Sequence, residues 1–536
     1  MMRDRERNIP LVVGVTGHRV IRPQDRQAIA AAVKGELVKL QERCPHAPLV
    51  MLSSLAEGGD LLCADAAAEL GIPLVAALPR QLESYEQDFS PDAKERLAFH
   101  CGRAEQVFVA PFTEAEPENG ISQDFQYRQA GIYVAAHSHV LLALWDGGPG
   151  TSAACGTAEA VGFALRGDYF PAAGVSLRSD GNEAVIHVFT PRGERTEENP
   201  GTVHILGDRR GMEEIFDRTE EFNRLSADVK KREKQLVPAD RAEDPALERM
   251  EKIYCAASSL SAAAAKQYRL VLALLAVAST ILTMAFLLYD EAQLIWMIFV
   301  CGAMLICAFL CQRHAARSAC HRHYIEYRAL AECLRVQGFL RYAGSGIMAA
   351  DQLSWTQQEE TAWIMDALYA LSIGKVPQEK HDIRGCWVDE QRKYHLWAEK
   401  RALRDTDVSD RVVRVALILS IAFYCAAVCF ELLCGGQIRP AAVPVKDAEW
   451  YRTLLKLVLG CISAVTLFIA NYYGKLSLPR QLSDHQKMAR FYGKMGEQLT
   501  LHGQTEELLT VLAREELIEN GNWSSYQRDN APDLSL

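Results

Sequence analysis

The pattern of apolar and polar residues divides the chain into two unlike halves. In the first half, short apolar runs alternate with longer stretches of helix-favouring sequence, and these runs lie at residues 11–15, 49–53, 74–78, 106–110, 139–145 and 184–190. Short buried strands that alternate with helices are typical of a parallel sheet covered by helices on both faces. The pattern therefore predicts an α/β fold with a doubly wound parallel sheet that the run at 184–190 completes.

The second half contains four apolar runs that are too long for strands, at residues 270–289, 292–312, 415–430 and 457–474. The first run has twenty residues without a charge, enough for a helix to cross a hydrocarbon core of about 30 Å. Only Asp290 and Glu291 separate it from the second run. We therefore expect an α-helical membrane module with four transmembrane helices in two hairpins, embedded in a lipid bilayer.

Positive residues indicate how these helices are oriented. Lys266 and Arg269 precede the first run, Arg411 and Arg414 precede the third, and the link between the first two runs has neither Lys nor Arg. Because Lys and Arg are retained on the cytoplasmic side of a membrane, both termini and residues 313–411 should face the cytoplasm. The chain is expected to be a multi-pass membrane protein.

These patterns define six segments along the chain. They are an α/β domain at 1–205, a helical linker at 206–265, a first transmembrane hairpin at 266–312, a cytoplasmic helical segment at 313–411, a second hairpin at 412–474, and cytoplasmic C-terminal helices at 475–536.

Composition removes several classes of function. Lys and Arg total 58 against 68 Asp and Glu, so the net charge is −10, which argues against nucleic acid as a partner. The 15 cysteines include no C-x-x-C pair, as expected in a reducing compartment. Cys320 and His323 provide at most half of a tetrahedral metal site. We expect neither a metal nor a cofactor.

Three loops carry the candidate chemistry, at residues 14–19, 56–60 and 147–157. Each is rich in glycine or small residues and follows an expected strand. Ligands bind such sheets beyond the carboxyl ends of the strands, where helix N-termini attract anions. None of the loops is a G-x-G-x-x-G fingerprint or a Walker A loop. Three such loops at one edge nevertheless favour a nucleotide-like ligand.

The candidate ligand-binding residues come from these loops and from two nearby tyrosines. They are Gly14, Thr16, Gly17, His18, Arg19, Glu57, Gly58, Gly59, Asp60, Tyr85, Tyr127, Asp146, Gly147, Gly156 and Thr157.

Each candidate has an alternative, purely structural role. His18 and Arg19 either contact phosphate or ribose, or are a loop histidine and a surface arginine. Glu57 and Asp60 either accept hydrogen bonds from ribose hydroxyls or cap a helix. The tyrosines either stack on a base or pack within the domain, and Asp146 either meets the ligand or forms a turn.

These motifs resemble a known family. Gly-Val-Thr-Gly-His-Arg at 14–19, Leu-Ser-Ser-Leu-Ala-Glu-Gly-Gly-Asp at 52–60, and Ala-Leu-Trp-Asp-Gly at 143–147 with Gly-Thr-Ala at 156–158 look like the SLOG superfamily of Rossmann-like nucleotide-binding domains. The resemblance covers residues 8–193. The following region is similar in architecture to SLATT proteins, in which membrane hairpins accompany such domains in bacterial conflict systems.

The resemblance implies a bacterial inner-membrane effector in antiviral defence. Its SLOG domain would sense a nucleotide-derived second messenger, either an ADP-ribose derivative or a cyclic nucleotide, and would gate an ion channel or pore. Four slender spans with few polar residues cannot enclose a wide pore alone, so a homo-oligomer is expected.

One departure from the family separates sensing from catalysis. LOG-type phosphoribohydrolases carry P-G-G-x-G-T-x-x-E, and counting from Gly156 places the catalytic position on Ala160, with Glu159 one residue early. Catalytic residues are therefore not assigned. The alternative function is a membrane-anchored nucleotide hydrolase of LOG type in which Glu159 or Glu57 acts as the base.

Among the polar residues of the long runs, Glu431 is the pore or membrane candidate, because an ionisable group within a membrane is often functional. The alternative is a position near the outer end of its helix, where it reaches water. Lys456, at the start of the fourth run, is its expected partner.

Overall fold

The computed structural model describes residues 7–149, 156–167, 169, 184–192, 199–229, 235–238, 244–377, 379–435, 447–475 and 478–529. The chain forms two compact units. The first comprises Met1–Leu260, Glu326–Ile383 and Gln504–Ser524, and we call it the sheet unit. The second comprises Ser261–Ile325, Arg384–Gly503 and Ser525–Leu536, and we call it the helical unit.

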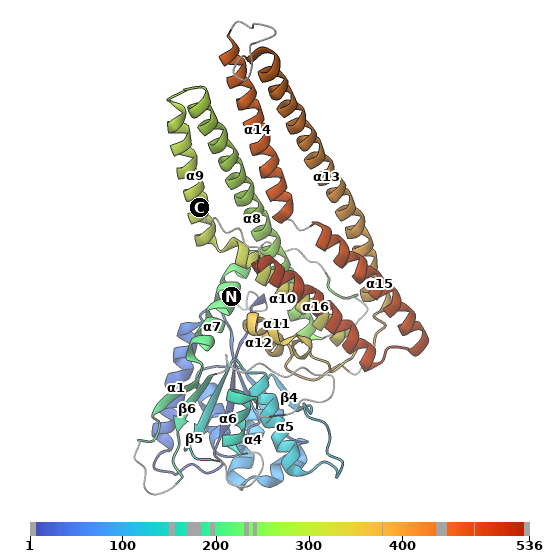
Figure 1. The fold of residues 1–536 in the computed structure, drawn as a ribbon. Helices are drawn as coiled ribbons and strands as arrows, with labels where there is room; N and C mark the ends of the chain where they lie inside the picture. Colours follow the sequence, from blue (N-terminus) through green and yellow to red (C-terminus); the bar gives the residue numbers. More distant parts are fainter. Residues whose placement is uncertain are drawn as a thin grey trace. The chain divides into compact units, whose positions relative to one another are not determined.

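A seven-stranded sheet forms the centre of the sheet unit (Figure 1). Its strands are β1 (Leu11–Gly17), β2 (Leu49–Ser53), β3 (Leu74–Leu78), β4 (Gln106–Val109), β5 (Val140–Trp145), β6 (Ala184–Phe189) and β7 (Val203–Gly207). Their spatial order is β4-β3-β2-β1-β5-β6-β7, and the first six run parallel. The strand order reverses between β1 and β5, which is where such sheets bind ligands.

Helices cover both faces of this sheet. The helices α1 (Arg26–Arg43), α2 (Gly59–Glu69) and α4 (Pro91–Arg103) follow β1, β2 and β3, whereas α5 (Gln123–Ala136) and α6 (Thr157–Arg166) precede and follow β5. The helices α5 and α6 pack on each other and on the central strands, through a core that includes Ala130, Val134, Ala160 and Phe163. The predicted α/β class is confirmed, with a sheet that is mostly parallel.

The edge strand β7 is the one correction to the expected sheet. It pairs antiparallel with β6, and the predicted domain boundary at residue 205 falls inside it. The run Val-His-Ile-Leu-Gly is short, and its side chains are intermediate or exposed, so it lacks the apolar pattern that revealed the buried parallel strands.

The amino ends of the strands are covered by segments from far along the chain. The helix α7 (Arg209–Ala227) places Asn223 against β1, where its side chain exchanges two hydrogen bonds with the backbone of Ile9, at 2.8 and 2.9 Å. The helix α12 (Ala362–Ser372) lies nearby in the same unit, and Ala370 and Ile373 belong to the core of the sheet. Residues 362–373 therefore complete the hydrophobic core of a domain that begins more than three hundred residues earlier.

The remaining long helices of the chain are α8 (Pro245–Glu291), α9 (Met297–Ser318), α10 (Cys320–Tyr342), α13 (Glu390–Phe430), α14 (Ala448–Lys475), α15 (Leu478–His502) and α16 (Glu506–Asp529). Within the helical unit, α8 and α9 lie side by side, and so do α13 and α14 (Figure 1). Short segments include α3 (Leu82–Tyr85), α11 (Trp355–Glu360) and two π-helical stretches, at Arg384–Asp389 and Glu431–Gly435.

Three helical stretches among the described residues are long and apolar enough to cross a membrane: Pro245–Glu291, Met297–Tyr342 and Arg384–Cys434. They contain the first and third of the four predicted runs and residues 297–312 of the second, whose expected start at residue 292 lies five residues before α9. The fourth run, at 457–474, lies in α14, a helix of 28 residues whose side chains from 467 onwards fall outside the described part of the chain. A helical region with three candidate spans is consistent with a membrane protein.

Candidate functional site

A cavity of about 550 Å³ lies at the carboxyl edge of the sheet, beside the point where the strand order reverses. Nine of the fifteen candidate residues line it: Thr16, Gly17, His18, Arg19, Asp60, Tyr85, Tyr127, Gly156 and Thr157. Its volume falls within the usual range for small-molecule sites. The remaining six candidates, Gly14, Glu57, Gly58, Gly59, Asp146 and Gly147, are not among the lining residues.

The glycines of the first two loops serve backbone packing. A Cβ added to Gly17 would lie 2.8 Å from the Cα of Gly59, so the end of β1 and the start of α2 are in backbone contact. Gly58 has a φ of +97°, and a Cβ there would lie 2.3 Å from the carbonyl oxygen of His18. Gly14 lies within β1, where a Cβ would meet the Ser138 side chain. Gly17 lines the cavity. The other three glycines of these loops, Gly14, Gly58 and Gly59, do not line it and instead support its wall through backbone packing.

Asp60 is the buried carboxyl group of the cavity. Its side chain is 3% exposed, and its Oδ2 accepts hydrogen bonds from the Ser53 hydroxyl at 3.0 Å and the Ala56 amide at 3.4 Å. Burial raises the pKa of this carboxyl to about 7, against the lowering effect of these hydrogen bonds. Asp60 therefore ties β2 to α2, which is a structural role, and it also lines the cavity in which a ligand is predicted.

Two tyrosines form an aromatic wall. The rings of Tyr85 and Tyr127 are 5.8 Å apart, and the Arg19 guanidinium lies 5.3 Å from the centre of the Tyr127 ring. The Tyr127 hydroxyl donates to Asp88, which also pairs with Arg80. The Tyr85 hydroxyl is buried and has no hydrogen-bond partner among the described residues. A buried hydroxyl without a partner is costly, and a polar ligand in this cavity would satisfy it.

The amino end of α6 opens into the cavity through Gly156, Thr157 and Ala158. Its N-cap residue, Gly156, has no side chain that could cap the helix, whereas the Ser122 hydroxyl caps the neighbouring α5 by accepting from the Phe125 amide at 3.1 Å. Uncapped amides at a helix start carry partial positive charge and bind anions. The preceding loop residues 150–155 lie outside the described part of the chain.

Asp146 and His18 meet a residue that the sequence analysis did not select, Arg192. The backbone amide of Asp146 and the Arg192 Nε both donate to His18 Nε2, each at 3.0 Å. Arg192 also pairs with Asp146 Oδ2 at 3.1 Å and lines the cavity. Arg192 lies three residues after the end of β6, so its position just beyond an expected strand, at the edge where a ligand is predicted, was the available indication.

A further group of missed residues comes from α5. Gln123, Asp124, Arg128 and Gly131 line the cavity beside Tyr127. These positions occupy adjoining faces of one helix. The sequence analysis selected only Tyr127 from this helix, because nothing in the helix sequence says which of its faces turns toward the edge of the sheet.

The two glutamates considered as hydrolytic bases are engaged elsewhere. Glu57 accepts from the amide and hydroxyl of Ser90, at 3.2 and 2.6 Å, at the start of α4. Glu159 pairs with Arg128, which also binds Glu114 at 2.8 and 3.0 Å. Neither glutamate lines the cavity.

Glu431 pairs with a different residue from the one predicted. Arg452 on α14 donates to it, with Nη2 at 3.2 Å from Oε2, while Lys456 binds Glu291 at the end of α8, at 3.1 Å. Arg452 and Lys456 are one helical turn apart and thus share a face. The expected Glu431–Lys456 pair is therefore replaced by two pairs that join α14 to two different helices.

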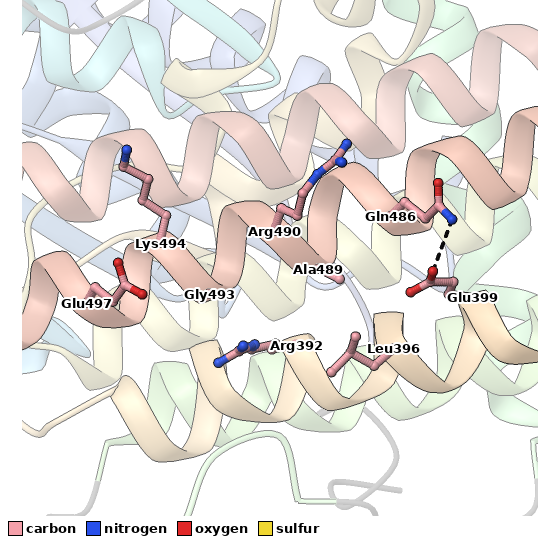
Figure 2. A pocket seen from close by; sticks show the side chains of 9 residues that line it. All are labelled: Arg392, Leu396, Glu399, Gln486, Ala489, Arg490, Gly493, Lys494 and Glu497. Atoms are coloured by element: carbon pink, nitrogen blue, oxygen red, sulfur yellow. Dashed lines mark hydrogen bonds between the residues drawn. The ribbon is translucent and has the colours of Figure 1, made fainter.

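A second hollow, of about 530 Å³, lies within the helical unit between α13 and α15 (Figure 2). Ala489 and Gly493 leave space along α15, and the Gln486 side chain donates to Glu399 at 3.0 Å. Figure 2 shows Arg490 and Lys494 extending to one side of the groove and Arg392 lying across from them. These cations do not converge on one point, so the hollow is a poorer anion site than the cavity of the sheet unit.

The comparisons with known proteins assign no family. No family model matches the chain, and no curated protein is significantly similar to it.

Proposed function

We propose that the protein is a membrane effector whose sheet unit senses a nucleotide-derived messenger and whose helices gate or disrupt the inner membrane. The observation that carries this proposal is the cavity at the strand-order reversal, which combines the uncapped amino end of α6 with Arg19, Arg192 and an aromatic wall. Anionic phosphates suit the helix end and the guanidinium groups. A base suits the tyrosines. Resemblance to the SLOG superfamily supports the same ligand class.

Sensing is favoured over hydrolysis by the placement of the carboxylates. A general base must lie within hydrogen-bonding reach of the reacting group. Glu57 binds Ser90, Glu159 pairs with Arg128, and both stand outside the cavity lining. Two aspartates, Asp60 and Asp124, do line the cavity. The Oδ2 of Asp60 is occupied by Ser53 and Ala56, so the geometry argues against the two glutamates and the Asp60 Oδ2 as bases.

The helix α5 is the proposed route by which the ligand acts on the rest of the sheet unit. Its first two turns line the cavity, whereas Tyr133 and His137 at its other end meet the α12 segment. The Gly374 amide donates to the Tyr133 hydroxyl at 3.4 Å, and the His137 ring lies 5.1 Å from that of Tyr369. A ligand that binds one position of α5 better would favour the matching position of the α12 segment.

The membrane part of the proposal consists of four spans in two hairpins, formed by α8 with α9 and by α13 with α14. Residues of α8, α10 and α16 are divided between the two units, so the chain passes from sensor to membrane helices inside continuous helices. Few polar side chains lie within the spans. A water-filled pathway would therefore need several copies, and we propose a homo-oligomer with both termini cytoplasmic.

The test uses the full chain in detergent, because residues 362–373 belong to the core of the sheet unit. The protein is incubated with ADP-ribose isomers and cyclic nucleotides, separated from free ligand, and the retained nucleotide is identified by mass. Liposomes containing the protein are then tested for dye release on addition of that nucleotide. Arg192→Gln is the cavity variant, and Arg43→Gln, at a surface pair with Asp217, is the matched control.

An intact retained nucleotide that triggers release from wild-type and R43Q liposomes, and much less from R192Q liposomes, is the expected result. Recovery of a free base or ribose phosphate instead of the intact nucleotide would contradict the sensor and support the membrane-anchored hydrolase. Retention without release, or a protein that is monomeric with and without ligand, would overturn the pore.

A further inference from the structure

The side chain of His18 joins three loops at the carboxyl edge of the sheet. It follows β1, and its Nε2 accepts from the Asp146 amide after β5 and from the Arg192 guanidinium after β6. Both distances are 3.0 Å, and the ring is only 5% exposed. The backbone on either side is fixed as well, because the His18 amide donates to Leu144 and its carbonyl accepts from Gly59.

A third group near His18 Nε2 has the opposite hydrogen-bonding preference. Asp146 Oδ1 lies 3.2 Å from the same Nε2. This carboxylate oxygen would accept a hydrogen bond from Nε2 if Nε2 carried a proton. The two neighbouring N–H donors instead require a lone pair on Nε2. Two donors against one acceptor, in a buried setting, favour the neutral ring with its proton on Nδ1.

The charges around the ring agree with this assignment. Burial lowers the pKa of His18 below 6.5, Arg192 and more weakly His187 on β6 lower it further, and Asp146 opposes them. The buried Asp60 lies on the adjoining α2 and also lines the cavity. At neutral pH the imidazole is therefore an acceptor that holds Arg192 beside the cavity.

We propose that His18 is a positioning residue and a proton-operated latch for Arg192. Protonation of His18 removes one of the two acceptors that hold Arg192, leaves it only the pair with Asp146 Oδ2 at 3.1 Å, and so weakens binding of an anionic ligand. In the neutral state, Nε2 accepts from Arg192 and from the Asp146 amide. In the protonated state, Nε2 donates to Asp146 Oδ1. The Nε2 hydrogen then faces the Asp146 amide and the Arg192 guanidinium, whose hydrogen bonds Nε2 accepted in the neutral state. This inference rests on the proposed function for its ligand, whereas the latch itself is defined by the protein.

Titration of a second cavity residue, Asp60, should change the affinity for an anion in the opposite direction along the pH scale. The Asp60 carboxyl, with a pKa of about 7, becomes negative as the pH rises through that value, and it then repels an anion. Affinity should therefore fall on both sides of an optimum: through His18 on the acidic side and through Asp60 on the alkaline side. The two limbs can be separated by replacing each residue in turn.

The ligand-free test is amide hydrogen exchange of the full chain in detergent between about pH 7.5 and pH 5. After correction for intrinsic exchange, protection of the peptide that contains the Asp146 amide should fall about tenfold in the wild type. It should stay constant in His18→Gln, which keeps an acceptor and does not titrate. His46→Gln, an exposed histidine paired with Glu220, should behave as the wild type. Unchanged protection in the wild type, or an equal fall in H18Q, would refute the latch.

The binding test uses ADP-ribose as the probe over the same pH range. We expect wild-type affinity to fall about tenfold toward acid, H18Q to lose none of its affinity, and Arg192→Gln to be weak at every pH. Parallel acid limbs in the wild type and H18Q would overturn the latch. If ADP-ribose binds no variant while the exchange difference persists, the proposed ligand is wrong and the latch stands.

Discussion

The sheet unit and the helical unit handle polar groups in opposite ways. In the sheet unit, Asp60, Asn223 and His18 are at least nine-tenths buried and hydrogen-bonded. Asn223 and His18 bind residues far away in the sequence, whereas Asp60 binds the nearby Ser53 and Ala56. In the helical unit, the ion pairs Glu431–Arg452 and Lys456–Glu291 lie at the ends of the apolar runs. Over residues 297–310 of α9 the exposed side chains are apolar, including Phe299 at 77% and Ile306 at 62%.

This difference is the one expected if water surrounds the sheet unit and lipid surrounds the apolar helices of the helical unit. A water-soluble fold hides its apolar residues and can bury polar groups once each finds a partner. A helix in lipid turns apolar residues outward and keeps its charges near the ends. The exposed faces of α8 and α9 thus agree with the membrane location of the proposal. The comparison also says where substitutions should matter most, which is in the buried contacts of the sheet unit.

The largest effect is expected from Gly59→Val. A Cβ at this position would lie 2.7 Å from the Gly17 Cα, and backbone atoms on both sides cannot move apart easily. The free energy of unfolding should fall by more than about 3 kcal/mol, with loss of nucleotide retention, measured by thermal unfolding and the binding assay.

Two alanine substitutions serve as controls for Gly59→Val. Gly35→Ala on α1, where a Cβ meets nothing within 4 Å, should be neutral or slightly stabilising. Gly460→Ala on α14 would press only on the end of the flexible Leu287 side chain and should cost far less than G59V. Equal costs for G59V and G460A would contradict the contrast between the units.

Acid should weaken the sheet unit through His139. This buried ring accepts from the Val12 amide at 3.1 Å, and burial lowers its pKa to about 4. An unfolded histidine takes up its proton near pH 6.5, so the unfolded state binds more protons between about pH 6.5 and 4. Stability should therefore fall as the pH is lowered through that window, by up to about 3 kcal/mol.

The measurement is the pH dependence of thermal unfolding of wild type and His139→Gln. The variant should show a flatter acid limb, even if it is less stable at neutral pH. An unchanged limb would mean that His139 is not the buried group responsible.

A moderate effect is expected from Ile373→Ala. Ile373 is 7% exposed and packs in the core of the sheet with Phe108, Tyr133 and Ala370. Truncating it should destabilise the sheet unit by about 2 kcal/mol, measured by denaturant unfolding with hydrogen exchange of the strand peptides. Val376→Ala, at an exposed position nearby, is the control. If the strands keep their full protection in I373A, the 362–373 segment is not part of their core.

The smallest effect is expected at the outer pair of the helical unit. Glu431→Gln and Arg452→Gln should each lower stability only slightly, and the double variant should lose little more than either alone. Lys456→Gln should be additive with E431Q, because Lys456 binds Glu291. Strong coupling between residues 431 and 456 would instead restore the pairing expected from the sequence.

The predictable parts of the fold were those with a local pattern. Apolar runs marked β1 to β6 to within a residue or two, because buried parallel strands are continuous apolar segments. The half-exposed β7 lacked that pattern. In the candidate site, residues at the end of a strand or the start of the next helix were found, such as Thr16 in β1 and Thr157 in α6, since chain order places them at the edge of the sheet that holds the cavity. Arg192 and the lining residues of α5 were missed, apart from Tyr127.

The sequence by itself determined the parallel α/β class, the edge of the sheet at which the candidate cavity lies, and the presence of long apolar helices. Each follows from periodicity or run length within a few dozen residues. Tertiary structure alone decided that Ile373 enters the sheet core, that Gly58 and Gly59 support the wall of the cavity, and that His18 accepts from Arg192. It also decided that Glu431 binds Arg452 and that Lys456 binds Glu291. These choices depend on distances between residues far apart in the chain, and helix rotation, packing and burial set those distances.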